Sequence, residues 1–161
     1  MKPLLYLDVD GVLNCPGAPG SEALTVSCDW GVLPVHAPAG VRRHLRELDR
    51  LFEIVWATAW FDRAHFLLES LGLDLGPWPV LDWRDLKLPE IVRHASGRPF
   101  VWMDDDVGFE MRQLPEGFVG PDQRHLLLEI DPTLGLTAAN VETLRAFAAE
   151  KGSGHGTQGR E

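Results

Sequence analysis

The sequence predicts a single α/β domain in which a parallel five-stranded sheet is covered by helices on both faces. Short apolar segments alternate with amphipathic ones along the chain, which is typical of parallel strands joined by helical crossovers. Several apolar segments lack polar alternation, as expected of strands that are buried on both faces. The length of 161 residues suits one domain, and no linker long enough to divide the chain is visible.

The expected strands are apolar segments bounded by turn residues. They lie at residues 4–9, 52–58, 77–83, 99–103 and 125–131. The expected helices lie between and after them, at residues 38–51, 62–71, 88–95, 107–114 and from Thr137 onward. Gly72 is expected to end the second helix, and Thr137 to cap the last one.

The remaining segments are rich in turn-forming residues. Residues 14–38 have room for a loop or a short hairpin around the sequence LTVSCDWGVLPV, but no room for an inserted domain. Residues 152–161 are glycine-rich and polar, so we expect a disordered tail and a folded domain at residues 1–151.

The composition is typical of a soluble globular protein, with 45% hydrophobic and 24% charged residues. A formal net charge of -9 argues against broad binding to a phosphate backbone, but leaves a transient nucleic-acid substrate open. Cys15 and Cys28 fit neither a disulfide framework nor a zinc site, so we expect free thiols. No signal peptide or membrane-spanning segment is visible, which predicts a cytoplasmic protein without a membrane partner.

Acidic residues follow two of the expected strands. Asp8 and Asp10 come after the first strand, Asp104 and Asp105 after the fourth, and Thr58 stands at the end of the second. The carboxyl ends of strands in such a sheet meet at one edge, where ligands bind. A turn or a helix cap accounts for a single aspartate, but four carboxylates at one edge indicate a hard cation. Mg²⁺ suits a site with few carboxylates, several waters and a phosphate.

These residues carry a resemblance to the haloacid dehalogenase (HAD) superfamily. The stretch DVDGV, followed by Leu13, resembles its first motif, DxDx(T/V)(L/V). Thr58 in VWATAW resembles the second motif, Lys87 the third, and the pair Asp104–Asp105 the fourth, in the superfamily's order. The stretches DVDGVLN, ATAW and WMDDD, with a later DP..GLT segment, resemble a bacterial group of small HAD domains related to the HAD module found in some RNA-repair proteins. The resemblance implies one Rossmann-like (HAD) domain without a cap domain.

The resemblance also implies a phosphatase chemistry. Asp8 would be the nucleophile that forms an aspartyl-phosphate, and Asp10 would act first as general acid and then as general base. Thr58 would hydrogen-bond a phosphoryl oxygen, and Lys87 would offset the negative charge around it. The implied substrate-binding residues are Gly11, Thr58, Ala59 and Lys87.

The implied cofactor is Mg²⁺, held by Asp8, by the backbone carbonyl of Asp10, and by Asp104 with help from Asp105. The sequence leaves open which of Asp104 and Asp105 binds the metal directly, and whether Lys87 or Arg84 is the cation of the site. Asp106 is better explained as a helix N-cap than as a ligand.

Side chains beside the motifs have simpler explanations. Arg63 is more typical of a helix surface than of a phosphate site. The tryptophans that flank the motifs suit the core better than stacking on a base; they are Trp56, Trp60, Trp83 and Trp102.

The expected partner is a phosphorylated substrate, such as a nucleotide or a polynucleotide end. A site without a cap suits a substrate that is itself large, such as a nucleic-acid end or a phosphoprotein. A small substrate also fits if a partner subunit covers the site, and the oligomeric state stays open. The alternatives are a phosphotransferase and a non-catalytic phosphate-binding or receiver-like module. In a receiver domain the acceptor lies on a middle strand and no acidic pair follows the lysine, so the order of motifs favours a hydrolase.

Overall fold

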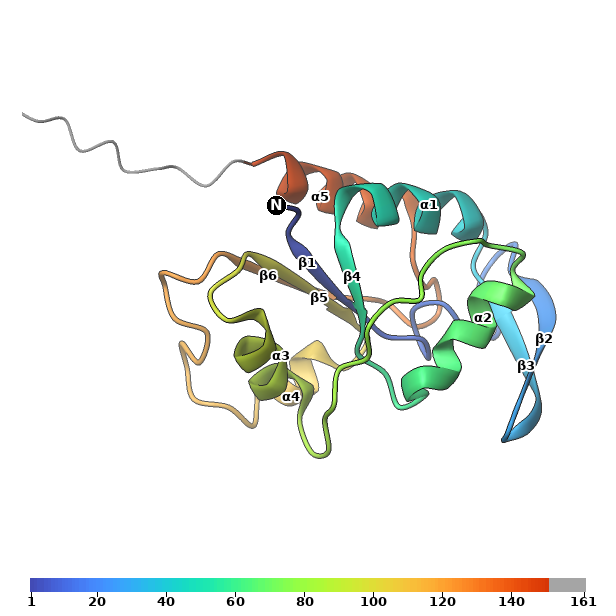
Figure 1. Cartoon of the computed structure of the whole chain (residues 1–161), viewed down its shortest axis with the longest axis horizontal. Coiled ribbons are helices and arrows are strands. Elements are labelled where there is room, and N and C mark those ends of the chain that lie inside the picture. Colours follow the sequence, from blue (N-terminus) through green and yellow to red (C-terminus); the bar gives the residue numbers. More distant parts are fainter. Residues whose placement is uncertain (151–161) are drawn as a thin grey trace, which may run out of the picture.

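A computed structural model of the chain describes residues 1–150, so the expected tail at residues 152–161 lies outside the described residues. It contains a parallel four-stranded sheet in the order β4-β1-β5-β6, and a separate antiparallel hairpin, β2-β3 (Figure 1). The strands of the sheet are β1 (Leu4–Leu7), β4 (Glu53–Trp56), β5 (Phe100–Asp104) and β6 (His125–Glu129). The hairpin strands are β2 (Glu22–Cys28) and β3 (Gly31–Ala37).

Helices cover both faces of the sheet, as predicted (Figure 1). One face is covered by α1 (Val41–Leu51) and α5 (Ala138–Ala149), and the other by α3 (Lys87–Ala95) and α4 (Val107–Met111). A 3₁₀ turn at Phe61–Arg63 leads into α2 (Ala64–Ser70), which packs against the hairpin.

The central strand β1 is buried on both sides. Leu5 and Leu7 belong to the core under α1 and α5, whereas Leu4 and Tyr6 belong to the core under α3. This alternation follows from the pleat of a strand, which sends successive side chains to opposite faces. A strand without polar alternation is therefore explained by burial on both faces, as its sequence predicted.

The prediction of a fifth strand at residues 77–83 is wrong. That segment pairs with β4 only through an isolated bridge between Trp56 and Val80. The bridge consists of two 2.8 Å hydrogen bonds, from the Trp56 amide to the Pro79 carbonyl and from the Leu81 amide to the Trp56 carbonyl. Pro77 and Pro79 have no amide hydrogen to donate, so a longer ladder does not form.

Several local predictions are confirmed. Residues 14–38 form a hairpin and its flanking loops, and no cap domain is present within residues 1–150. Thr137 begins α5 with a capping box, in which its side chain and that of Asn140 each accept the other residue's backbone amide. Cys15 and Cys28 are free thiols. None of the helices in residues 1–150 has the length and apolar character needed to cross a bilayer.

Candidate active site

The sheet order brings the predicted motifs together. Strand β1 lies between β4 and β5, so residues that follow these three strands share one edge of the sheet. The Asp8 amide donates to the Met103 carbonyl of β5 at 3.2 Å, and the Ala57 amide donates to the Leu7 carbonyl of β1 at 2.9 Å. These hydrogen bonds set Asp8 beside Asp104 on one side and beside Thr58 on the other.

A buried lysine lies between two buried carboxylates in this edge. Nζ of Lys87 is 2.6 Å from Oδ2 of Asp104 and 3.3 Å from Oδ2 of Asp8. Asp8 and Lys87 are each 7% exposed, and Asp104 is fully buried. Burial alone would lower the pKa of Lys87, but the charges of Asp8 and Asp104 outweigh burial and raise it. Lys87 therefore stays protonated and is the cation of this site.

One lysine does not balance the carboxylates around it. Burial, followed by the charge of Asp104, raises the pKa of Asp8 to about 7, although Lys87 acts in the opposite direction. Burial, together with a hydrogen bond to Asp104 and its charge, raises the pKa of Asp105 to about 6. Both shifts show that a further positive charge at this place would be favourable.

The acidic residues have the donor set of a hard divalent cation. Asp8, Asp104 and Asp105 each offer a carboxylate oxygen, and these oxygens lie within 4.8 Å of one another. Carboxylate oxygens are the ligands that Mg²⁺ takes in proteins, usually beside several waters. The three residues fit such an ion, and they include three of the four predicted metal ligands.

The side chain of Asp10 lies outside this group of oxygens. Its Oδ2 accepts a 3.0 Å hydrogen bond from Nε1 of Trp60, and its Oδ1 accepts one of 3.0 Å from Nδ2 of Asn14. The carboxylate is exposed, whereas Asp8 is buried. Of the ligands that the resemblance implies, Asp10 was expected to contribute its backbone carbonyl, so the position of its side chain does not conflict with that expectation.

Gly11 permits the close approach of Asp105. Its φ of 80° lies in the left-handed region, which favours glycine, and a Cβ there would lie 2.3 Å from Oδ2 of Asp105. The glycine of the first motif is thus required both by the turn after β1 and by the position of a candidate metal ligand.

Thr58 and Ala59 lie on the β4 side of the site. Thr58 is 1% exposed, and its Oγ1 accepts a 3.2 Å hydrogen bond from the Trp60 amide. Ala59 lines a cavity of about 360 Å³ together with Asp8, Asp10 and Lys87. All the predicted substrate-binding residues are therefore at or next to this cavity, which we name the catalytic cavity after the activity expected of it.

Glu110 is a residue of the site that the sequence did not indicate. It is 6% exposed, and its two carboxylate oxygens accept hydrogen bonds from the amides of Lys87 at 2.8 Å and Leu88 at 2.9 Å. A carboxylate from α4 thus caps the N-terminus of α3, where Lys87 is the first residue. Burial raises the pKa of Glu110, and the two amides oppose that shift. Glu110 belongs to none of the predicted motifs, and its partners lie 23 and 22 positions away in the sequence, so no local pattern indicated it.

The geometry decides one of the questions that the sequence left open, namely which residue is the cation of the site. Lys87, not Arg84, contacts the carboxylates, because Arg84 is exposed and lines a neighbouring cavity. Asp104 and Asp105 both belong to the candidate metal group. Asp106 stands at the N-cap position of α4 and outside that metal group, as predicted, although its side chain makes no capping hydrogen bond; it lines the catalytic cavity.

The flanking side chains behave largely as predicted. Arg63 forms an ion pair with Asp29, and its guanidinium lies 4.3 Å from the centroid of the Trp30 ring, so it is engaged on the hairpin. Three tryptophans are in the core and Trp83 is partly exposed, lining the catalytic cavity. The core members are Trp56, Trp60 and Trp102.

Comparison of the chain with protein-family models, with curated proteins and with solved structures found no match.

Proposed function

We propose that the protein is a Mg²⁺-dependent phosphomonoester hydrolase that works through an aspartyl-phosphate on Asp8. The observation that carries this proposal is the buried group of Asp8, Lys87 and Asp104 at the carboxyl edge of the sheet, with Asp105 beside it. Carboxylates that need further positive charge suit a metal ion, which would in turn offset the negative charge of a phosphoryl group. The resemblance of the motifs to the HAD superfamily supports the same chemistry.

The first step transfers the phosphoryl group to the protein. A carboxylate oxygen of Asp8 attacks phosphorus, and the bond between phosphorus and the ester oxygen breaks. Asp10 donates a proton to that oxygen, and the alcohol leaves. Trp60 and Asn14 orient the Asp10 carboxyl group by the two 3.0 Å hydrogen bonds.

The second step regenerates the protein. Asp10, now a carboxylate, takes a proton from a water molecule as the water attacks phosphorus. The bond between phosphorus and Asp8 breaks, and inorganic phosphate leaves.

Three further groups serve both steps. Lys87 offsets the charge that gathers between Asp8 and the phosphoryl oxygens, and Thr58 hydrogen-bonds one of those oxygens. Bound Mg²⁺, held by Asp8, Asp104 and Asp105 with the Asp10 carbonyl, would neutralise charge and orient the phosphoryl group. The substrates we propose are nucleotides or polynucleotide ends; an ester as large as a polynucleotide end can enter because no cap domain covers the site within residues 1–150.

Release of inorganic phosphate from a panel of phosphomonoesters tests the proposal. Wild-type protein should release phosphate with Mg²⁺ and not with a chelator, and Asp8→Asn should abolish release. Inactivity towards nucleotides, oligonucleotide ends and generic esters alike would count against the proposal, as would full activity of Asp8→Asn.

A further inference from the structure

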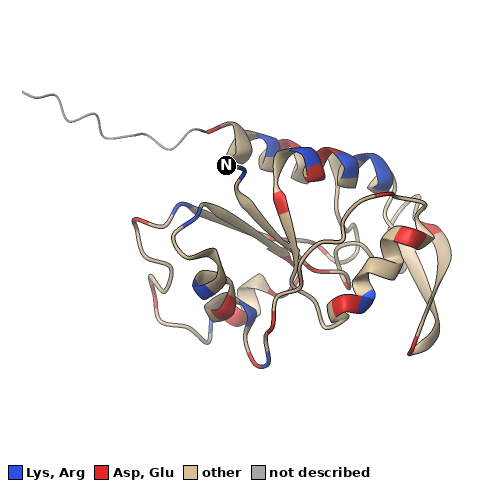
Figure 2. Cartoon of the chain, in the orientation of Figure 1, with Lys and Arg blue, Asp and Glu red and all other residues tan. Residues whose placement is uncertain are grey.

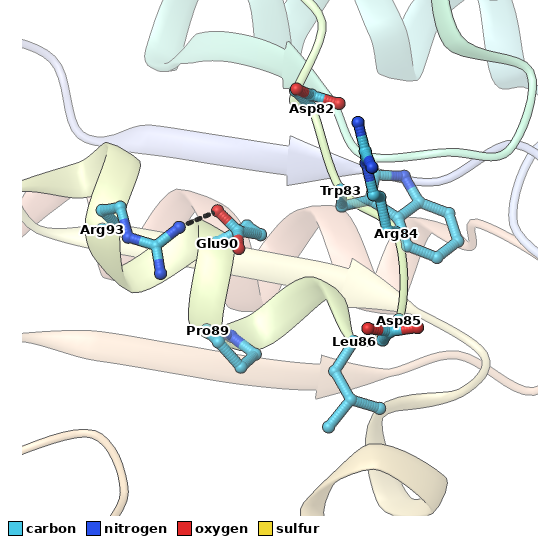
Figure 3. A pocket seen from close by; sticks show the side chains of 8 residues that line it. All are labelled: Asp82, Trp83, Arg84, Asp85, Leu86, Pro89, Glu90 and Arg93. Carbon is cyan, nitrogen blue, oxygen red and sulfur yellow. Dashed lines mark hydrogen bonds and ion pairs between the residues drawn. The ribbon is translucent and has the colours of Figure 1, made fainter.

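A second cavity adjoins the catalytic cavity, and no step of the proposed hydrolysis uses it. Its volume is about 480 Å³, and its lining shares Trp83, Asp85 and Leu86 with the catalytic cavity. The lining comes from the loop before α3 and from α3 itself (Figure 3). A substituent that extends from the phosphoryl site past Trp83 therefore enters this second cavity.

The size of the two cavities is that of a small-molecule site. Their volumes of about 360 Å³ and 480 Å³ lie in the range of roughly 300–1,000 Å³ that is usual for ligand pockets. One ring system with its substituents fills such a space, whereas a chain of linked units would extend beyond it.

The charge of the two cavities opposes a polyanion. Eight carboxylates and three basic side chains line them in total. Lys87 is held by Asp8 and Asp104, and Arg93 pairs with Glu90 on α3 (Figure 3). Arg84 is the third basic residue, and it makes no ion pair within residues 1–150. Much of the chain's basic charge lies elsewhere, along α1 (Figure 2). A phosphate backbone could therefore pair with one free cation here and would be repelled by the carboxylates around it.

The side chains of the second cavity suit hydroxyl groups. Asp82 and Asp85 are exposed carboxylates that can accept hydrogen bonds, and the Arg84 guanidinium can only donate them. Trp83 adds an aromatic surface that is fixed in place. Its ring stacks on Phe61 with centroids 6.0 Å apart, Nζ of Lys87 lies 5.0 Å from its centroid, and its Nε1 donates to the Thr58 carbonyl at 3.3 Å. The part of the ring that remains exposed, with polar groups beside it, suits a ligand that has an apolar surface and a polar edge.

We propose that the second cavity binds the alcohol part of the substrate, and that this alcohol is a small, uncharged, hydroxyl-rich ring: a nucleoside or a sugar. The inference rests on the proposed phosphomonoester hydrolysis and narrows it. The substrate is then a nucleoside monophosphate or a sugar monophosphate, in preference to the phosphorylated end of a polynucleotide.

Kinetics on four substrates test this inference. The substrates are a ribonucleoside monophosphate, a hexose phosphate, a phosphorylated oligonucleotide and 4-nitrophenyl phosphate, whose leaving group has no further hydroxyl groups. Arg84→Met and Asp82→Asn should each lower kcat/KM about tenfold for the preferred hydroxyl-rich ester, because each removes a hydrogen bond with a charged partner. The same variants should lower kcat/KM for 4-nitrophenyl phosphate much less, because its leaving group offers neither side chain a hydroxyl group.

The matched control is Arg50→Met, which removes an exposed arginine of α1 that lines neither cavity. It should leave kcat/KM unchanged for all four substrates. The ribonucleoside monophosphate and the hexose phosphate are compared in wild-type protein, and the one with the higher kcat/KM shows whether the alcohol is a nucleoside or a sugar. A phosphorylated oligonucleotide that is hydrolysed better than both would overturn the inference, as would Arg84→Met with equal effects on all substrates or with none.

A binding measurement separates this inference from the proposed hydrolysis. Unphosphorylated ribonucleoside and methyl hexoside are titrated into wild-type protein, and the indole N–H signal of Trp83 is followed by NMR. One of the two should shift that signal, and Arg84→Met should weaken the binding. No shift with either compound would overturn the inference even if the protein hydrolyses 4-nitrophenyl phosphate. A shift in a protein without phosphatase activity would instead reject the proposed function and keep the cavity as a binding site.

Discussion

Replacing Lys87 by methionine should destabilise the protein strongly at alkaline pH. The substitution leaves the side chains of Asp8 and Asp104 buried without the ammonium group that lies 3.3 Å and 2.6 Å from their oxygens. Removing one partner of a buried ion pair costs about 3–5 kcal/mol, because the remaining charge is uncompensated. We expect the free energy of unfolding near pH 8 to fall by about that amount in a metal-free buffer.

The loss should shrink as the pH is lowered. With Lys87 present, the pKa of Asp8 is already raised to about 7, and removing the lysine removes an interaction that lowers it. A carboxyl group whose pKa is higher in the folded than in the unfolded protein binds a proton more tightly when folded, so acid favours the folded state. At a pH well below 7 Asp8 is protonated, and its share of the uncompensated charge disappears.

Urea unfolding at two pH values, followed by tryptophan fluorescence, measures both effects. Arg84→Met is the matched control, because it removes a nearby cation that contacts neither carboxylate, and its stability should equal that of wild type. If Lys87→Met were as stable as wild type near pH 8, the reasoning about the buried ion pair would be refuted.

Three further predictions concern the metal group and its supports. Mg²⁺ affinity, measured by calorimetry, should fall as the pH drops from about 8 to about 5. The reason is that Asp8, with a pKa of about 7, and Asp105, with a pKa of about 6, must lose their protons to bind the ion. An affinity independent of pH would contradict this prediction. Gly11→Ala should lower the free energy of unfolding by roughly 1–3 kcal/mol and weaken Mg²⁺ binding, since φ is 80° and the new Cβ would lie 2.3 Å from Oδ2 of Asp105. Wild-type stability and affinity in that variant would show that Asp105 can move freely. Glu110→Gln should lower the free energy of unfolding by about 1–3 kcal/mol, because it weakens the acceptor of the Lys87 and Leu88 amides. Hydrogen exchange at these two amides should become faster, and unchanged exchange at both would rule out the cap.

Much of the fold and part of the site could be predicted from local sequence. The apolar runs that end in Asp8 and Asp104 placed both residues at one sheet edge, because parallel strands bring their carboxyl ends together. The fifth strand was predicted wrongly, since the apolar content of residues 77–83 outweighed the two prolines that prevent a ladder.

The supports of the site depend on tertiary contacts that no local pattern specifies. Glu110 reaches Lys87 from another helix, and Trp60 reaches Asp10 from the segment that follows the neighbouring strand β4. The choice between Arg84 and Lys87 depends on where the irregular loop ends and α3 begins, and Lys87 is the first residue of that helix. Helix boundaries of this kind are set by a cap such as Glu110, which lies far along the chain.

The central claim is that Asp8 carries the phosphoryl group during turnover. Rapid acid quenching of the protein with Mg²⁺ and a hydrolysed phosphomonoester, followed by mass spectrometry of its peptides, tests it most directly. The account predicts the mass of one phosphoryl group on the peptide that contains Asp8, and its absence in Asp8→Asn or with a chelator. Phosphate release without that adduct, or an adduct on any other residue, would contradict the account.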